Sequence, residues 1–219
     1  MMNWLDQLKT WLLLALLLGG SIACASPSVS GPTVASSKVV TVIKKPMAVH
    51  RKITNKPSTV GYPASFTVWQ FHCVPALEYD VVGKKQTGKQ QLVSLKITKA
   101  DVQLSLVVTM NLTDFATKRE IAHEEGHVKI CSTAYARASL FAESAAQSII
   151  GRVYQGQGDD MDMACKAAIQ QAAAELTSQY RKGTVDYVNR VSQLYDKIDA
   201  KEKMPVDRAV NLAERQAFP

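Results

Sequence analysis

Between residues 38 and 111, apolar residues come in short runs of β-branched and aromatic side chains, which is typical of β-strands. Prolines and glycines separate the runs, and the polar stretch 84–91 predicts a hairpin loop. We therefore expect four or five strands in an antiparallel sheet. The strands are predicted at residues 39–43, 66–73, 92–97 and 102–111.

From residue 114 onward the apolar residues follow a helical period instead. They predict a long helix ending near Tyr154 and a second from about Met161 to residue 203, with a kink at Gly183 and a stop at Pro205. A short helix is expected in the tail. The expected N-caps are Asp114 for the first helix and Asp159 or Asp160 for the second.

The link between the two long helices, residues 155–160, is short, so the helices are predicted to be antiparallel neighbours. The C-terminal end of the second helix then faces the beginning of the first. The predicted fold class is α+β, with the antiparallel sheet (38–111) packed on the helix pair (114–203) in a single domain over residues 38–219.

The beginning of the chain has the features of an export signal. Residues 1–25 contain an apolar run, Trp11–Leu18, followed by small residues that suit cleavage. The run is too short to span a bilayer, so no integral membrane span is expected after its removal. Residues 26–37 are a polar linker without periodicity. A periplasmic or secreted location follows, with a lipoprotein acylated at Cys24 as the alternative.

Charge is unevenly distributed along the chain. Residues 38–99 carry eleven Lys/Arg and two Asp/Glu, a net charge of +9, whereas residues 100–219 carry fourteen and sixteen, a net charge of −2. The basic β half allows association with an anionic envelope surface or an acidic partner, or is a solvated surface. The sequence contains no recognised nucleic-acid-binding motif, so no nucleic-acid partner is expected.

The first long helix contains the pattern H-E-x-x-H at His123, Glu124 and His127. Residues four apart lie on one helical face, so the two imidazoles can bind one Zn²⁺ ion together. Both histidines lie on the apolar stripe of the helix, which favours a metal-binding site over a chance occurrence of the pattern. Glu124 is positioned to act as the general base toward a water on the metal.

The chain resembles a family of predicted secreted zinc-dependent proteases of bacteria. In that family a β segment precedes a His-Glu-x-Gly-His helix, and a long helix with a Tyr-Asp motif follows. The matching residues here are His123, Glu124, Gly126, His127, Tyr195 and Asp196. The resemblance covers roughly residues 65–203 and implies a zincin-like fold. One departure is clear, because Lys201 and Glu202 stand where the family has His-Gly.

No histidine follows His127, so a third metal ligand further along the chain must be a carboxylate. Glu143 is excluded, since it lies about 24 Å further along the helix and on the opposite face. The resemblance favours Asp196, while the apolar phase of the second helix favours Asp199 or Glu202. Tyr195 is expected either to stabilise an oxyanion or to pack in the helix seam.

Three cysteines remain after export, which leaves at least one outside any intramolecular disulfide. Cys131 and Cys165 are not expected to pair, because the helix geometry places them about 27 Å apart. Pairing of Cys73 with either one stays open. Two functions are consistent with the sequence: an exported zinc metallopeptidase acting on a peptide or protein substrate, and a non-catalytic envelope protein that binds a partner through its basic β half.

Overall fold

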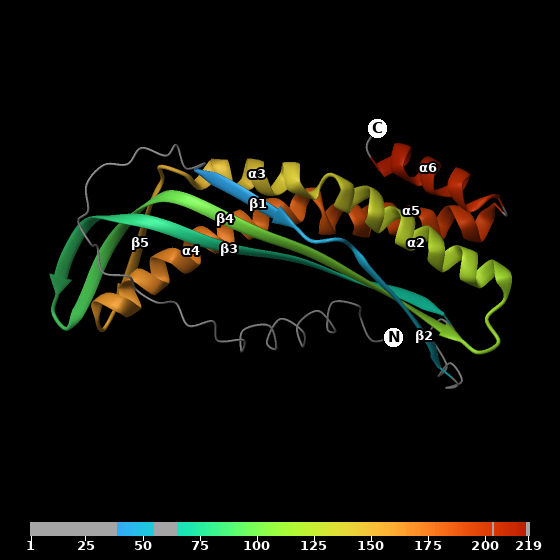
Figure 1. The fold of residues 1–219 in the computed structure, drawn as a ribbon, viewed down its shortest axis with the longest axis horizontal. Coiled ribbons are helices and arrows are strands. Elements are labelled where there is room, and N and C mark those ends of the chain that lie inside the picture. Colours follow the sequence, from blue (N-terminus) through green and yellow to red (C-terminus); the bar gives the residue numbers. More distant parts are fainter. Residues whose placement is uncertain (1–38, 55–64, 203, 218–219) are drawn as a thin grey trace. The chain divides into compact units, whose positions relative to one another are not determined.

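The computed structural model describes residues 39–54, 65–202 and 204–217. The longest strand, β4 (Gln90–Thr113), is the centre of the five-stranded sheet found in these residues (Figure 1). Along one edge β4 pairs with β3 (Phe66–Thr87) over nearly its whole length. Along its other edge it pairs in succession with β5 (Val153–Gly158), β1 (Val40–Lys44) and β2 (Ala48–Thr54).

The predicted antiparallel sheet on a single helix pair is wrong. The strands β3 and β5 are antiparallel to β4, but β1 and β2 run parallel to it, so the sheet is mixed and the fold is of the mixed α/β type. The strand β2 was not predicted, because His50–Lys52 is polar and β2 pairs on one edge alone among the described strands.

Two of the predicted strands merge into one in β4, and a β-bulge explains why the sequence hides this. Every second residue from Val93 to Ile97 is fully buried, and the alternation resumes one position out of phase from Ala100 to Leu112. The register against β3 shifts at the same place, where Glu78 pairs with Lys99 but Tyr79 pairs with Ile97. The extra residue keeps the apolar side chains on one face through the bend.

The strand β3 also continues beyond its predicted end. Pro75 does not interrupt it, because Pro lacks only the N–H, and β3 is an edge strand among the described residues, where that donor is not needed. The predicted loop 84–91 is mostly paired strand, and the turn itself is Gly88-Lys89. Gly88 takes a positive φ of 63°, which a glycine adopts without steric cost.

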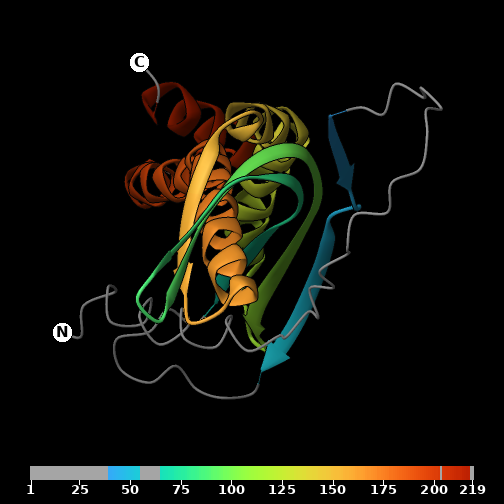
Figure 2. The same ribbon diagram turned by 90° about the vertical axis from the view of Figure 1, so that its left-hand side faces the viewer.

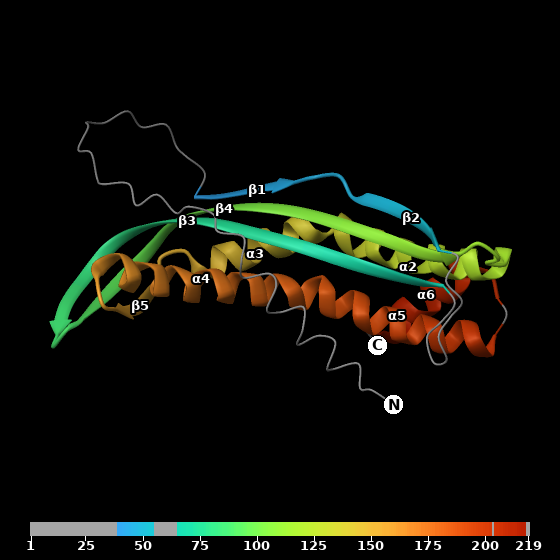
Figure 3. The same ribbon diagram turned by 90° about the horizontal axis from the view of Figure 1, so that it is seen from below.

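Helices cover one face of the sheet, as Figure 3 shows, and Figure 2 shows the sheet curving around them. Each predicted long helix consists of two shorter helices, the first pair meeting at Arg137 and the second at Thr184. The break after Gly183 confirms the predicted kink, and a final helix confirms the predicted short one. The helices are α2 (Lys118–Ala136), α3 (Ala138–Ile149), α4 (Met161–Gly183), α5 (Val185–Lys201) and α6 (Val206–Ala217).

The link between the helix pairs contains β5 rather than a simple loop. Its glycines let α4 pack directly on the strand, because a Cβ on Gly158 would lie 2.6 Å from the backbone nitrogen of Ala164. Asp160 caps α4 by accepting a hydrogen bond from the Met163 amide. It is one of the two residues, Asp159 and Asp160, that were predicted as the N-cap of this helix. The chain therefore reverses direction between the two helix pairs close to the predicted link, residues 155–160.

The described residues belong to one compact unit. The predicted signal peptide (1–25) and linker (26–37) lie outside the described residues, so they stay predictions. Among the described helices, none combines the length and the apolar character that crossing a bilayer requires.

Candidate metal centre

The helix α2 carries the H-E-x-x-H residues, and its start is fixed by a capping box that was not predicted. Thr117, not Asp114, is the N-cap: its hydroxyl accepts from the Glu120 amide at 3.2 Å, and the Glu120 carboxylate accepts from the Thr117 amide at 2.7 Å. From this start, His123 and His127 lie one turn apart on the side of α2 that faces α5.

The helix α5 brings Asp196 to the histidine pair, as the predicted pairing of the long helices implied. Its Oδ1 atom lies 3.0 Å from Nε2 of His127 and 3.4 Å from Nε2 of His123. Together, His123, His127 and Asp196 form a group that could hold a metal ion.

The distances from Asp196 to the two imidazole nitrogens suit ligands of a single tetrahedral ion. With bonds of about 2.1 Å, two ligand atoms of a tetrahedral zinc site lie about 3.4 Å apart, close to the 3.4 and 3.0 Å that separate Oδ1 of Asp196 from His123 and His127. The side chain of Asp196 is 53% exposed, whereas that of His127 is 9% exposed. The group is therefore anchored in the protein on one side and accessible on the other.

Hydrogen bonds within the group control its protonation. The hydrogen bond to Asp196, supported by one to Asp199, raises the pKa of His123 above its usual value although burial opposes this. Burial alone would raise the pKa of Asp196, but hydrogen bonds from His123 and His127 hold it well below its usual range. Asp196 is thus a carboxylate at neutral pH, as a metal ligand must be.

Glu124 is buried beside the histidines, with 4% of its surface exposed. Thr67 on β3 donates a hydrogen bond from its hydroxyl to Oε2 of Glu124, over 2.7 Å. The bond anchors one carboxylate oxygen to the sheet. Glu124 also lines a pocket together with His123 and Asp196, so the residue adjoins the open side of the site.

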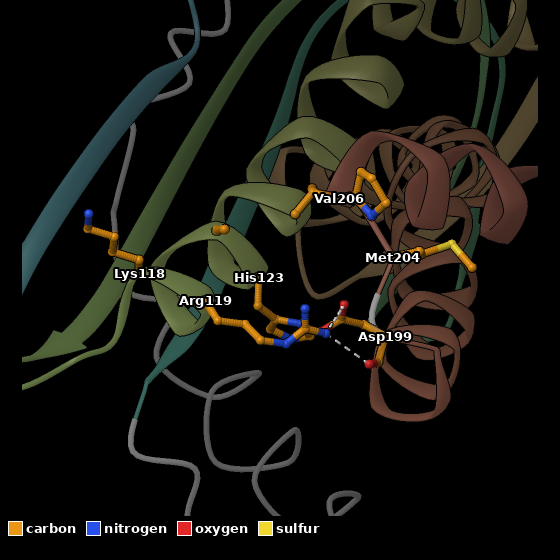
Figure 4. A pocket seen from close by; sticks show the side chains of 8 residues that line it. Lys118, Arg119, His123, Asp199, Met204 and Val206 are labelled. Carbon is orange, nitrogen blue, oxygen red and sulfur yellow. Dashed lines mark hydrogen bonds and ion pairs between the residues drawn. The ribbon is translucent and has the colours of Figure 1, made fainter.

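Asp199 contacts His123 at the ring nitrogen away from Asp196. Its Oδ2 lies 3.0 Å from Nδ1 of His123, and its Oδ1 accepts a hydrogen bond of 2.7 Å from Nη2 of Arg119. The Asp199 side chain is 11% exposed. Figure 4 shows Arg119 reaching along His123 to this carboxylate.

Aromatic packing fixes the two imidazole rings. Tyr195 stacks on His123 with ring centroids 4.9 Å apart and meets His127 edge-on at 5.2 Å, while Trp69 of β3 stacks on His127 at 6.1 Å. Tyr195 reaches this position because residue 126 is glycine: a Cβ there would lie 2.9 Å from Cε1 of the tyrosine and closer still to other ring atoms.

Two pockets adjoin His123, and both are lined by Arg119, His123 and Asp199. The first, about 370 Å³, is drawn in Figure 4 and is completed by Lys118 and by apolar residues of α2, of the segment before α6 and of the start of α6. The second, about 360 Å³, contains Glu124 and Asp196 and is therefore the pocket that opens on the metal group.

The carboxylates considered from the sequence have different positions. Asp196 lies with the histidine pair, Asp199 lies behind His123, and Glu202 is the C-cap of α5, outside the group. Glu143 is on α3, a different helix from the histidines. Lys201 is the last residue of α5.

Several residues of the site gave no recognisable signal in the sequence. Thr67 and Trp69 belong to a predicted strand, but nothing in a strand pattern indicates which helix residue it faces. Arg119 lies in the first turn of α2, and nothing in the sequence pattern connects it to Asp199. No disulfide joins Cys131 to Cys165 in the structure.

Comparisons with models of protein families, with curated proteins and with solved structures found no match. The resemblance to predicted secreted zinc-dependent proteases therefore stays a prediction that rests on the sequence motifs.

Proposed function

We propose that this protein is an exported zinc-dependent hydrolase, and specifically a metallopeptidase. The observation that carries the proposal is the convergence of Nε2 of His123, Nε2 of His127 and Oδ1 of Asp196 at separations of 3.0 and 3.4 Å. Two imidazoles and one carboxylate are the ligand set of a familiar class of catalytic zinc sites. Zinc bound there would supply an acidified water and a Lewis acid for a substrate carbonyl.

Glu124 has the position of a general base in this proposal. The hydrogen bond from Thr67 occupies Oε2, so Oε1 is the oxygen that accepts a proton from the attacking water. The second pocket gives a substrate access to Glu124, because that pocket is lined by both Glu124 and Asp196. The partly exposed Asp196 leaves a side of the metal group open to water, which a catalytic zinc requires.

Peptides or proteins are the proposed substrates, and the periplasm or the exterior is the proposed location. The substrate class rests on the H-E-x-x-H pattern with its glutamate in place. The location rests on the apolar run and small residues within residues 1–25.

The proposal is tested by replacing the base while keeping the ligands. The zinc-loaded protein should cleave members of a mixed peptide pool, detected by mass spectrometry. Glu124→Gln should bind zinc as the wild type does but lose cleavage, by at least about a hundredfold if the general base acts as such bases usually do. Glu125→Gln is the matched control, because Glu125 is the adjacent carboxylate and pairs on the surface with Arg51.

Cleavage that survives in Glu124→Gln would contradict the assigned role of Glu124. A wild-type protein that binds zinc but cleaves no peptide, under any of several pH and salt conditions, would contradict the peptidase proposal. The non-catalytic envelope protein with a partner at its basic β half would then be the better interpretation.

A further inference from the structure

We infer that Asp199, held by Arg119, is a positioning residue that fixes the tautomer and orientation of His123. The inference rests on the proposed function, because the His123 nitrogen that Asp199 leaves free, Nε2, is the one that the proposed function assigns to the metal. It assigns to Asp199 a role different from that of a ligand, because its carboxylate faces Nδ1 of His123 and not the nitrogen next to Asp196.

The direction of the hydrogen bond determines the tautomer. A carboxylate only accepts hydrogen bonds, so Oδ2 of Asp199, 3.0 Å from Nδ1 of His123, favours the tautomer with its proton on Nδ1. The protonated ring donates from both nitrogens, to Asp199 and to Asp196. When the ring loses one proton, the shorter contact to Asp199 favours keeping the proton on Nδ1, so Nε2, 3.4 Å from Oδ1 of Asp196, carries the lone pair. A metal can be bound by Nε2 in this tautomer without any rotation of the ring.

Arg119 holds the carboxylate in turn. Its Nη2 donates to Oδ1 of Asp199 over 2.7 Å and to the backbone oxygen of the same residue over 3.2 Å. One guanidinium nitrogen therefore fixes both the side chain and the backbone of Asp199. The contact also joins the first turn of α2 to the last turn of α5, the two helices that supply the metal group.

The other histidine lacks such a contact among the described residues. Nδ1 of His127 is buried and has no hydrogen-bond partner there, and its ring is held by Trp69 and Tyr195. The two ligands are thus oriented by different means. Loss of the Asp199 carboxylate should affect His123 while leaving His127 in place.

Asparagine cannot replace Asp199 in this arrangement. The aspartate accepts from Arg119 with one oxygen and from His123 with the other. An amide has one accepting oxygen, so in Asp199→Asn either Arg119 or His123 faces an NH₂ group that cannot accept a hydrogen bond.

Nuclear magnetic resonance of the imidazole nitrogens in the metal-free protein tests the inference directly, above the pH at which His123 is protonated. In the wild type, His123 should be predominantly the Nδ1–H tautomer. In Asp199→Asn its population should shift toward Nε2–H, while the His127 signals change little. A wild-type His123 that is mainly Nε2–H would overturn the inference, whether or not the protein proves to be a hydrolase.

Metal affinity gives a second measurement that does not depend on hydrolysis. Asp199→Asn should bind Zn²⁺ about 10- to 100-fold more weakly than the wild type in competition with a chelator. Arg119→Gln should show a smaller loss in the same direction, and both variants should alter the visible absorption of the Co²⁺-loaded protein. Lys129→Gln is the matched control, because it breaks another exposed ion pair on α2, with Asp207.

Wild-type affinity and an unchanged Co²⁺ spectrum in both Asp199→Asn and Arg119→Gln would overturn the positioning role. If Asp199→Asn does not fold, Arg119→Gln and the wild-type tautomer decide the question. Failure of Glu124→Gln to abolish cleavage would contradict the proposed catalytic base, but it would leave this inference standing.

Discussion

Tyr195 touches both histidines of the metal centre, and the environment of its hydroxyl limits what this residue can do there. The hydroxyl donates a hydrogen bond to the backbone carbonyl of His123 over 3.2 Å, and the residue is fully buried. Burial, with the nearby carboxylate of Asp199, also raises the pKa of Tyr195. A phenol in this position supports the backbone of α2 more readily than it donates to a substrate oxyanion.

Tyr195→Phe separates the two roles that the sequence left open. Loss of one buried hydrogen bond should lower the free energy of unfolding by about 1 kcal/mol, measured by urea denaturation. The rate of peptide cleavage per bound zinc should stay close to that of the wild type. A loss of about a hundredfold or more in that rate, with zinc still bound, would instead support the oxyanion role.

The residues of the site differ in how far the sequence could reveal them. His123, Glu124 and His127 are neighbours in one helix, so their spacing alone indicates a common face. Asp196 and Asp199 come from another helix, and there the rotation about the helix axis decides which carboxylate meets which nitrogen. That rotation depends on how Tyr195 packs against Gly126, which the apolar pattern does not report.

The crossing of α2 and α5 is the element-level feature on which the metal group depends. Gly126 allows the ring of Tyr195 to lie against the backbone of α2 at the point where the ligands converge. In an exposed helix, replacing glycine by alanine stabilises by up to about 1 kcal/mol. At this crossing the added methyl group would overlap the Tyr195 ring, so the sign of the effect should reverse.

Gly126→Ala should therefore lower the free energy of unfolding by about 1–3 kcal/mol, the usual cost of overpacking, and should weaken zinc binding as α5 moves away. Urea denaturation and chelator competition measure the two effects. Ser132→Ala, on the exposed face of α2, is the control for added helix propensity. A Gly126→Ala protein as stable as this control would show that the two helices do not make the close contact described.

Element types and several boundaries were predictable, whereas the sheet topology was not. Parts of β3 and β4 and the break at Gly183 leave clear patterns of apolar period and glycine placement, whereas the full lengths of the two strands do not. The parallel pairing of β1 and β2 with β4 leaves no such pattern, because side chains alternate in the same way in parallel and antiparallel strands. The polar residues of β5 likewise concealed a strand within an apparent loop.

At the scale of the whole molecule, one apolar core joins the sheet to all the described helices, and it contains several titratable groups. Burial raises the pKa of Cys131 to about 12, and burial with a hydrogen bond to Glu175 raises that of Tyr154 to about 12 as well. In the unfolded chain these groups ionise at about pH 8.5 and 10. As the pH rises, the unfolded state therefore loses its protons first.

The contribution of these two groups to the free energy of unfolding should accordingly be fully present below about pH 8.5. It should be lost progressively as the pH rises toward about 12. The urea midpoint measured at about pH 8 and about pH 10.5 tests this. Cys131→Ala should be less stable at the lower pH, because it leaves a small cavity, but should lose less on the shift to the higher pH. A midpoint that does not fall in the wild type would contradict the burial of these groups.

The central claim, that α2 and α5 together hold one zinc ion, is tested most directly by the metal content of the purified protein. The protein is incubated with Zn²⁺, and unbound zinc is removed without chelators. Inductively coupled plasma mass spectrometry should then give one zinc per chain for the wild type and for Glu143→Ala. It should give almost none for His127→Ala and a reduced content for Asp196→Ala. A wild-type protein without zinc under these conditions, or an Asp196→Ala variant that keeps a full equivalent at wild-type affinity, would contradict the account.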